Sequence, residues 1–148
     1  MKVIIAGGRL GPDKQVYGLP LDTIYALIDK RMKALPFTAT EIREGEAPGT
    51  DLLARCWARD HGIPCKRYPA DWKTHGKPAG PLRNRQMAEG KGDDGRADAL
   101  VAIWDGKSRG TEDMINTARS MGLQVFIEPV EGHYVDDLRR PAREIVYS

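Results

Sequence analysis

DALVAIWDGKSRGTEDMINTARSMG, residues 98–122, is the stretch that decides the fold class. Its first part, DALVAIWD (98–105), is an apolar run typical of a buried strand, and its last part, MINTARSMG (114–122), has helical spacing. Between them lies the turn GKSRGT (106–111). The start of a helix offers unpaired backbone N–H groups and the positive end of the dipole, which suit a phosphate or a carboxylate. The turn is not a Walker A loop, because the spacing G-x-x-x-x-G-K-S/T is absent.

Strand and helix patterns alternate along the rest of the chain. Four more segments are predicted strands: KVIIAGG (2–8), FTATEIREG (37–45), IPCKRYPA (63–70) and LQVFIEP (123–129). Three more are predicted helices: LPLDTIYALIDKRMKAL (19–35), GTDLLARCWARDHG (49–62) with Thr50 as its cap, and LRNRQMAEG (82–90). The Gly- and Pro-rich stretch DWKTHGKPAGP (71–81) is a predicted loop. This alternation predicts an α/β fold of three layers, with a mainly parallel sheet flanked by helices on both faces.

The length of 148 residues fits one domain, which we expect over residues 1–128. Residues 129–148 break the alternation and are predicted to form a C-terminal extension, either as an edge strand or as a contact with a second subunit. No apolar run approaches the length of a membrane span, and the first residues are too short an apolar run for a signal peptide. We therefore expect a cytoplasmic protein that does not bind membranes.

Charge and composition exclude several classes of function. A formal net charge of +2 with scattered basic residues argues against nucleic acid as a partner. Cys56 and Cys65 are expected to be reduced, buried thiols, and His61, His75 and His133 have no metal-ligand spacing. We expect no metal and no cofactor. The G-x-G-x-x-G pattern of dehydrogenases and the G-x-S-x-G pattern of hydrolases are both missing from the sequence.

Three predicted turns follow the strands at residues 7–9, 44–51 and 106–111. In an open α/β sheet, ligands bind at the carboxyl ends of the strands, so these turns are expected to meet at one edge. A single glycine turn is often only a turn, but three of them at one edge favour a phosphate-bearing ligand.

The side chains in and near these turns suit such a ligand. Ser108, Thr111 and Thr50 carry hydroxyl groups, and the guanidinium groups of Arg9 and Arg83 match phosphate oxygens. Asp51, Glu112 and Asp113 supply carboxylates that can accept hydrogen bonds from ribose hydroxyls. Each of the three also lies in the first turn of a predicted helix, where it would simply complement the dipole. That interpretation is favoured for Glu112 and is as good as a ligand role for Asp51 and Asp113.

Three segments, EGEAPGTDLLARCWARDHGIP (44–64), ADWKTHGKPAGPLRNRQM (70–87) and WDGKSRGTEDMI (104–115), resemble the YspA-like family of the SLOG superfamily. The resemblance starts at IIAGGR (4–9) and runs to about residue 128. It implies a Rossmann-like domain that binds nucleotide-derived ligands, in a homo-oligomer. The superfamily includes cytokinin-activating phosphoribohydrolases, a DNA-processing protein that loads recombinase, and sensors of ADP-ribose-type signals.

The phosphoribohydrolase motifs can be carried over position by position. Gly45 and Gly49 match the outer glycines of the phosphate turn, and Gly110 and Thr111 match the G-T of the second turn. Arg83 and Met87 match the R-K-x-x-M helix, with Asn84 in place of the lysine. Asp113 falls on the first motif glutamate, but Met114 replaces the second. Because a carboxylate of the enzymes is missing, the resemblance supports binding better than cleavage. The predicted ligand-binding residues are Gly7, Gly8, Arg9, Gly45, Gly49, Thr50, Asp51, Trp72, Arg83, Asn84, Ser108, Gly110, Thr111 and Asp113.

Trp72 belongs to the YspA-like pattern without a counterpart in the enzymes. It is expected either to stack on a base or to pack its loop against the sheet, and packing is slightly favoured.

Three functions follow as hypotheses. The first is a protein that binds a nucleotide, an ADP-ribose derivative or an NAD-derived signal, which in a phage would sequester or sense an immune signalling nucleotide. The second is an N-glycosidic hydrolase of nucleoside monophosphates, in which Arg83 orients the ligand and Asp113 polarises the ribose; these two would be the catalytic residues. The third is a nucleic-acid-associated protein, against which the near-neutral charge argues.

Overall fold

A single sheet of five strands forms the centre of the protein, in a computed structural model that describes residues 1–130. The strands are β1 (Lys2–Gly7), β2 (Glu41–Glu44), β3 (Cys65–Arg67), β4 (Ala99–Trp104) and β5 (Gln124–Pro129). Their order is β3-β2-β1-β4-β5, and every neighbouring pair is parallel. The predicted parallel sheet is therefore confirmed, and the direction of winding reverses between β1 and β4.

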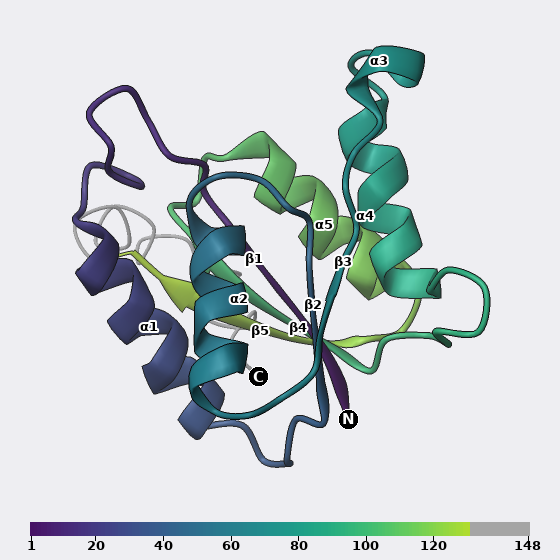
Figure 1. The fold of residues 1–148 in the computed structure, drawn as a ribbon, viewed down its shortest axis with the longest axis horizontal. Coiled ribbons are helices and arrows are strands. Elements are labelled where there is room, and N and C mark those ends of the chain that lie inside the picture. The colour runs from purple at the N-terminus through teal and green to yellow at the C-terminus, as the bar shows by residue number, and fades with distance from the viewer. Residues whose placement is uncertain (131–148) are drawn as a thin grey trace.

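Five helices surround this sheet: α1 (Leu21–Lys33), α2 (Thr50–Asp60), α3 (Trp72–His75), α4 (Ala79–Glu89) and α5 (Arg109–Ser120). Figure 1 shows α1 and α2 on one face of the sheet, α4 and α5 on the other, and α3 standing out from the body beyond α4. This arrangement confirms the predicted Rossmann-like three-layer fold. Among residues 1–130, no helix has the length and apolarity that a membrane crossing requires.

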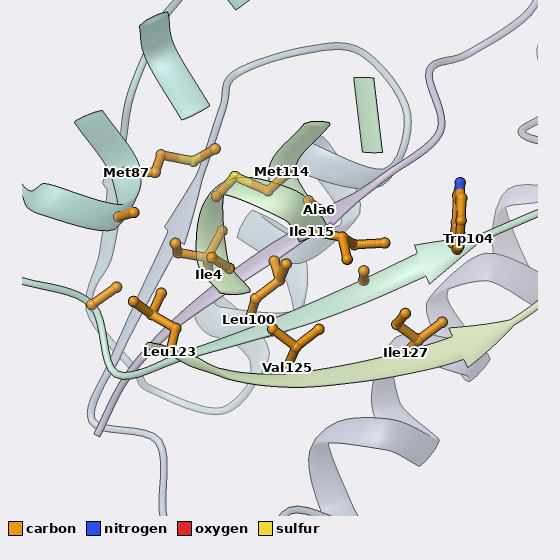
Figure 2. Close-up of a cluster of buried hydrophobic side chains, with 14 of the residues drawn as sticks. Ile4, Ala6, Met87, Leu100, Trp104, Met114, Ile115, Leu123, Val125 and Ile127 are labelled. Carbon is orange, nitrogen blue, oxygen red and sulfur yellow. The ribbon is translucent and has the colours of Figure 1, made fainter. Parts of the chain in front are cut away.

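Each face of the sheet carries its own apolar core. On one face, Met114 and Ile115 of α5 and Met87 of α4 pack over side chains of β1, β4 and β5 (Figure 2). On the other face, α1 and α2 cover a second cluster that includes Ile28 and Trp57. All six residues of β4 are buried, since neighbouring strands and helices surround it on every side. This explains why the β4 sequence is a continuous apolar run without alternation.

The predicted loop at residues 71–81 is wrong, because α3 and the first turn of α4 lie within it. The Asp71 carboxylate caps α3 by accepting a hydrogen bond from the Thr74 N–H (3.1 Å). Pro81 falls in the first turn of α4, where a backbone N–H has no partner inside the helix, so proline does no harm there. Because proline is tolerated in this first turn, α4 begins at Ala79, three residues before the predicted start at residue 82.

A buried arginine fixes the far end of α4. Arg43 on β2 is fully buried, and its Nη1 donates to the Met87 carbonyl (2.8 Å). Its Nη2 donates to the carbonyls of Asp94 (2.9 Å) and Gly95 (2.6 Å), and its Nε pairs with Glu41 (2.7 Å). These bonds hold the C-terminal end of α4 against the sheet. The N-terminal turns of α4 consequently lie at the edge where the strands end.

The predicted C-terminal extension at residues 129–148 lies outside the described residues from residue 131 onward. The last described contact is the Val130 N–H, which donates to the Trp104 carbonyl (3.1 Å).

Candidate functional site

The loops that follow β1, β2 and β4 meet at the carboxyl edge of the sheet. Arg9 and Gly49 form an antiparallel bridge, and the Leu10 N–H donates to the Pro48 carbonyl (3.1 Å), which joins the first two loops. Beside them a cleft of about 670 Å³ opens between these loops and helices α4 and α5. Ten of the predicted site residues line it: Gly7, Arg9, Asp51, Trp72, Arg83, Asn84, Ser108, Gly110, Thr111 and Asp113.

The other four predicted residues, Gly8, Gly45, Gly49 and Thr50, do not line the cleft. The Thr50 hydroxyl and backbone N–H both donate to the Gly8 carbonyl, at 2.9 and 3.1 Å. Thr50 is fully buried and is the first residue of α2, so its predicted role as the helix cap is wrong. The cap is Gly49, which has a φ of 102°. A Cβ at this position would lie only 2.6 Å from the Leu10 nitrogen, so the backbone conformation and the close approach both require glycine.

The start of α5 is open to the cleft. The Asp105 carboxylate accepts hydrogen bonds from the N–H groups of Lys107 (2.9 Å) and Ser108 (2.7 Å), and this turn directs the chain into the helix. The helix therefore begins at Arg109, five residues before the predicted start at residue 114. The Ser108 side chain does not cap α5; its hydroxyl donates instead to that of Thr111 (3.3 Å). A Cβ at Gly110 would meet nothing within 4 Å, so the protein itself does not require glycine there.

Arg83 crosses from α4 to the loop after β2. Its Nη1 donates to the Gly45 carbonyl, and its Nε donates to the Asn84 side-chain oxygen (3.1 Å). A Cβ at Gly45 would lie 2.7 Å from the Arg83 Cζ atom, so glycine at this position makes the contact feasible. Burial lowers the pKa of the Arg83 guanidinium, and the neighbouring Asp51 carboxylate opposes this effect. Arginine nonetheless stays a cation in proteins, so the cleft contains a partly buried positive charge.

Asp51 lies in the first turn of α2 and is 8% exposed. Burial raises the pKa of its carboxyl group from 3.8 to about 6, although the Ala47 N–H (3.1 Å) and the charges of Arg83 and Arg9 favour the carboxylate. The Glu44 carboxylate adds to the increase. A carboxyl group that its surroundings leave under-stabilised is well placed to interact with a ligand.

Asn84 connects the cation Arg83 with the carboxylate of Asp113. It is 5% exposed, and its amide nitrogen donates to the Asp113 carboxylate (2.8 Å) and, at 3.4 Å, to the Gly110 carbonyl. Its amide oxygen accepts the hydrogen bond from Arg83. The amide therefore holds Arg83 and Asp113 in a fixed relation.

Two more cations, Lys77 and Arg109, line the cleft and are absent from the predicted set. Lys77 lies in the segment predicted as a loop, and Arg109 lies in the turn before the predicted helix. Their basic side chains beside glycines are the only signal in the sequence. In residues 1–130, no three His, Cys, Asp or Glu side chains gather as a metal site would require.

The family model for the YspA, cpYpsA-related SLOG family matches residues 1–75, half of the 148-residue chain. The chain belongs to this family. The SLOG match spans β1 to α3, and so includes the side of the cleft from Gly7 to Trp72.

A phage protein extends the similarity beyond the region of the SLOG match. The Gene 61 protein of Mycobacterium phage D29 is 30% identical over 130 residues, which cover 84% of this chain and 94% of the phage protein. No solved structure matches the chain at a significant level.

Proposed function

We propose that this SLOG protein binds a phosphorylated, nucleotide-derived small molecule in the cleft at the carboxyl edge of its sheet. One observation carries the proposal. A single cleft brings together the uncapped start of α5, the cations Arg9 and Arg83, and the carboxylates Asp51 and Asp113. Its volume of about 670 Å³ lies within the range of about 300–1,000 Å³ that is common for small-molecule sites.

The anionic end of the ligand belongs at the start of α5. The first N–H groups of a helix have no partner within the helix, and the dipole adds positive potential there. The hydroxyl groups of Ser108 and Thr111 lie in the same turn, and Gly110 leaves room for close approach of a phosphate. Arg83 supplies a cation from α4, where burial strengthens its attraction for an anion.

The sugar of the ligand belongs between the two carboxylates. Asp51 and Asp113 line the same cleft from α2 and α5, and carboxylate oxygens accept hydrogen bonds from ribose hydroxyls. Asn84 holds Asp113 in place for such a bond. This arrangement favours a ribose-containing phosphate over a simple inorganic anion.

A second candidate function is N-glycosidic hydrolysis of a nucleoside monophosphate. It is favoured by the raised pKa of Asp51, about 6, in a cleft that also contains the Asp113 carboxylate. Asp51 would donate a proton to the departing base as the C1′–N bond breaks, and a water molecule would bond to C1′ and release its proton to Asp113. Arg83 would hold the phosphate in both functions.

The biological role and the assembly are further parts of the proposal. A relative encoded by a phage favours sequestering or sensing of a signalling nucleotide over metabolism. We expect a homo-oligomer, as the SLOG resemblance implies, and we expect no nucleic acid partner, because the net charge is only +2.

The test is a thermal-shift screen with ribose 5-phosphate, AMP, NAD and ADP-ribose, followed by chromatography of each mixture for released base. A ligand at a hundred times its Kd should add about 2.7 kcal/mol to the free energy of unfolding. Arg83→Ala should weaken binding about tenfold or more, because it removes a charge-assisted contact. The matched control is Arg85→Ala, since Arg85 lies on the same helix, is exposed and does not line the cleft. Equal effects of the two substitutions would contradict the proposed site.

A further inference from the structure

Trp72 is exposed where the cleft opens. It is 47% exposed, and it shares this property with Met1, Leu52 and Leu82 among the large apolar side chains of residues 1–130. Of these four, Trp72 is the one that lines the cleft. The prediction that it packs a loop against the sheet is not what the structure describes, because Trp72 is the first residue of α3, which stands out from the body (Figure 1).

Two hydrogen bonds hold the backbone that carries Trp72. The Asp71 cap and the bond from the Gly76 N–H to the Trp72 carbonyl (2.9 Å) fix the short helix that carries it. The edge of the ring lies close to α4: a Cβ at Gly80 would be 3.3 Å from the Trp72 Cη2 atom, so glycine lets the indole rest there. One edge of the ring is therefore supported by α4.

Arg9 reaches this ring from the other side of the cleft. Its Cζ atom lies over the indole, 5.2 Å from the ring centroid, and the residue itself is exposed in the loop after β1. A cation over an aromatic face is attracted by the ring's π electrons. The pair gives this end of the cleft an aromatic surface and an exposed cation, which differs from the N–H groups and carboxylates at the α5 end.

We infer that the ligand carries a planar aromatic ring, such as a nucleobase, and that this ring stacks on Trp72 beside Arg9 while the anionic group lies at α5. The inference rests on the proposed function and makes it more specific, because it distinguishes nucleotides from plain sugar phosphates. Stacking of this kind accepts any base, since every base has a π face. Trp72 then selects ligands that carry an aromatic ring, and the α5 end selects only for a negative charge.

The experiment compares AMP with ribose 5-phosphate by calorimetric titration of the full chain. Stacking of one base on an aromatic side chain changes affinity roughly 5- to 150-fold, so AMP should bind more tightly than ribose 5-phosphate by a factor in that range. Trp72→Ala should weaken AMP binding by several-fold more than it weakens ribose 5-phosphate binding, so that the advantage of AMP is lost, whereas Trp72→Phe should keep most of it. Leu82→Ala is the matched control, because Leu82 is 44% exposed on α4 and lies outside the cleft.

The outcomes separate the two proposals. If ribose 5-phosphate binds in a manner that depends on Arg83 and AMP binds no more tightly, the stacking inference is wrong and the proposed function stands. If Trp72→Ala weakens both ligands equally, the ring supports the fold rather than the base, and the inference is again overturned. If the wild type binds none of the four compounds of the thermal-shift screen, the proposed function fails and the inference fails with it. If it binds only NAD or ADP-ribose, the Trp72→Ala comparison is made with that ligand, and unchanged binding by the variant overturns the inference.

Discussion

Replacing Asp51 with asparagine should make the protein more stable at neutral pH, although it removes a site residue. Asp51 is buried in the cleft, and burial raises the pKa of its carboxyl group from 3.8 to about 6. A change of this size corresponds to about 3 kcal/mol, since one pKa unit equals about 1.4 kcal/mol. The neighbouring cations Arg83 and Arg9 are already included in this value, so burial outweighs their attraction.

The sign of the effect follows from which state loses its proton first. Well below pH 3.8 the carboxyl group is protonated in the folded and in the unfolded chain, and no cost arises. As the pH rises toward 6, the unfolded chain ionises before the folded one, so the free energy of unfolding of the wild type falls. Asparagine does not titrate, so the advantage of Asp51→Asn should grow by about 2.5 kcal/mol between pH 4 and pH 7.5.

Urea unfolding of both proteins at pH 4 and pH 7.5 measures this advantage directly. Asp22→Asn is the matched control, because Asp22 lies in the first turn of α1 as Asp51 does in α2, but its side chain is exposed. A difference between wild type and Asp51→Asn that is the same at both pH values would refute the reasoning. An equal growth in the Asp22→Asn control would show that burial is not the cause.

The same variant should bind AMP more weakly while being more stable. Replacing a residue that only stabilises the fold lowers the free energy of unfolding. Replacing a residue that binds a ligand often raises it. Asp51→Asn therefore distinguishes a ligand role from simple complementation of the α2 dipole, which would predict a loss of stability at neutral pH.

Three substitutions test other parts of the cleft. Gly110→Ala should leave urea stability unchanged or raise it by up to about 0.5 kcal/mol, but it should weaken AMP binding in calorimetry, because only a ligand needs the space there. Gly45→Ala forces the Arg83 guanidinium aside and removes its hydrogen bond to the Gly45 carbonyl, so unfolding should require about 1 kcal/mol less free energy and AMP affinity should fall. Asn84→Leu breaks the amide link from Arg83 to Asp113 and should cost about 1–3 kcal/mol in urea unfolding. Wild-type AMP affinity in both glycine variants, or wild-type stability in Asn84→Leu, would contradict these expectations.

Local patterns predicted the fold well where one residue type dominates a segment. The apolar run of β4 and the helical spacing of α2 are properties of neighbouring residues, so they can be predicted without knowledge of tertiary contacts. Prediction failed at residues 71–81, where glycine and proline usually mark a loop. There, one carboxylate cap and the tolerance of a first helical turn for proline produced α3 and the start of α4.

The buried network at Arg43 shows a second kind of failure. The strand sequence EIRE (41–44) has charged residues at three of its four positions, and nothing in it indicates that Arg43 is fully buried. Its partners Met87, Asp94 and Gly95 are more than forty positions further along the chain. Hydrogen bonds between such distant residues cannot be inferred from the local pattern of one sequence.

The sequence by itself determined the layered α/β architecture and the edge of the sheet where the glycine turns meet. Its alternating patterns demand a parallel sheet, and a parallel sheet brings the ends of all its strands, with their glycine turns, to the same side. Only the tertiary structure decided which side chains face the cleft. Thr50 turns its hydroxyl into the wall and Arg83 points inward, because helix rotation and the position of α4 depend on long-range packing that no short stretch of residues encodes.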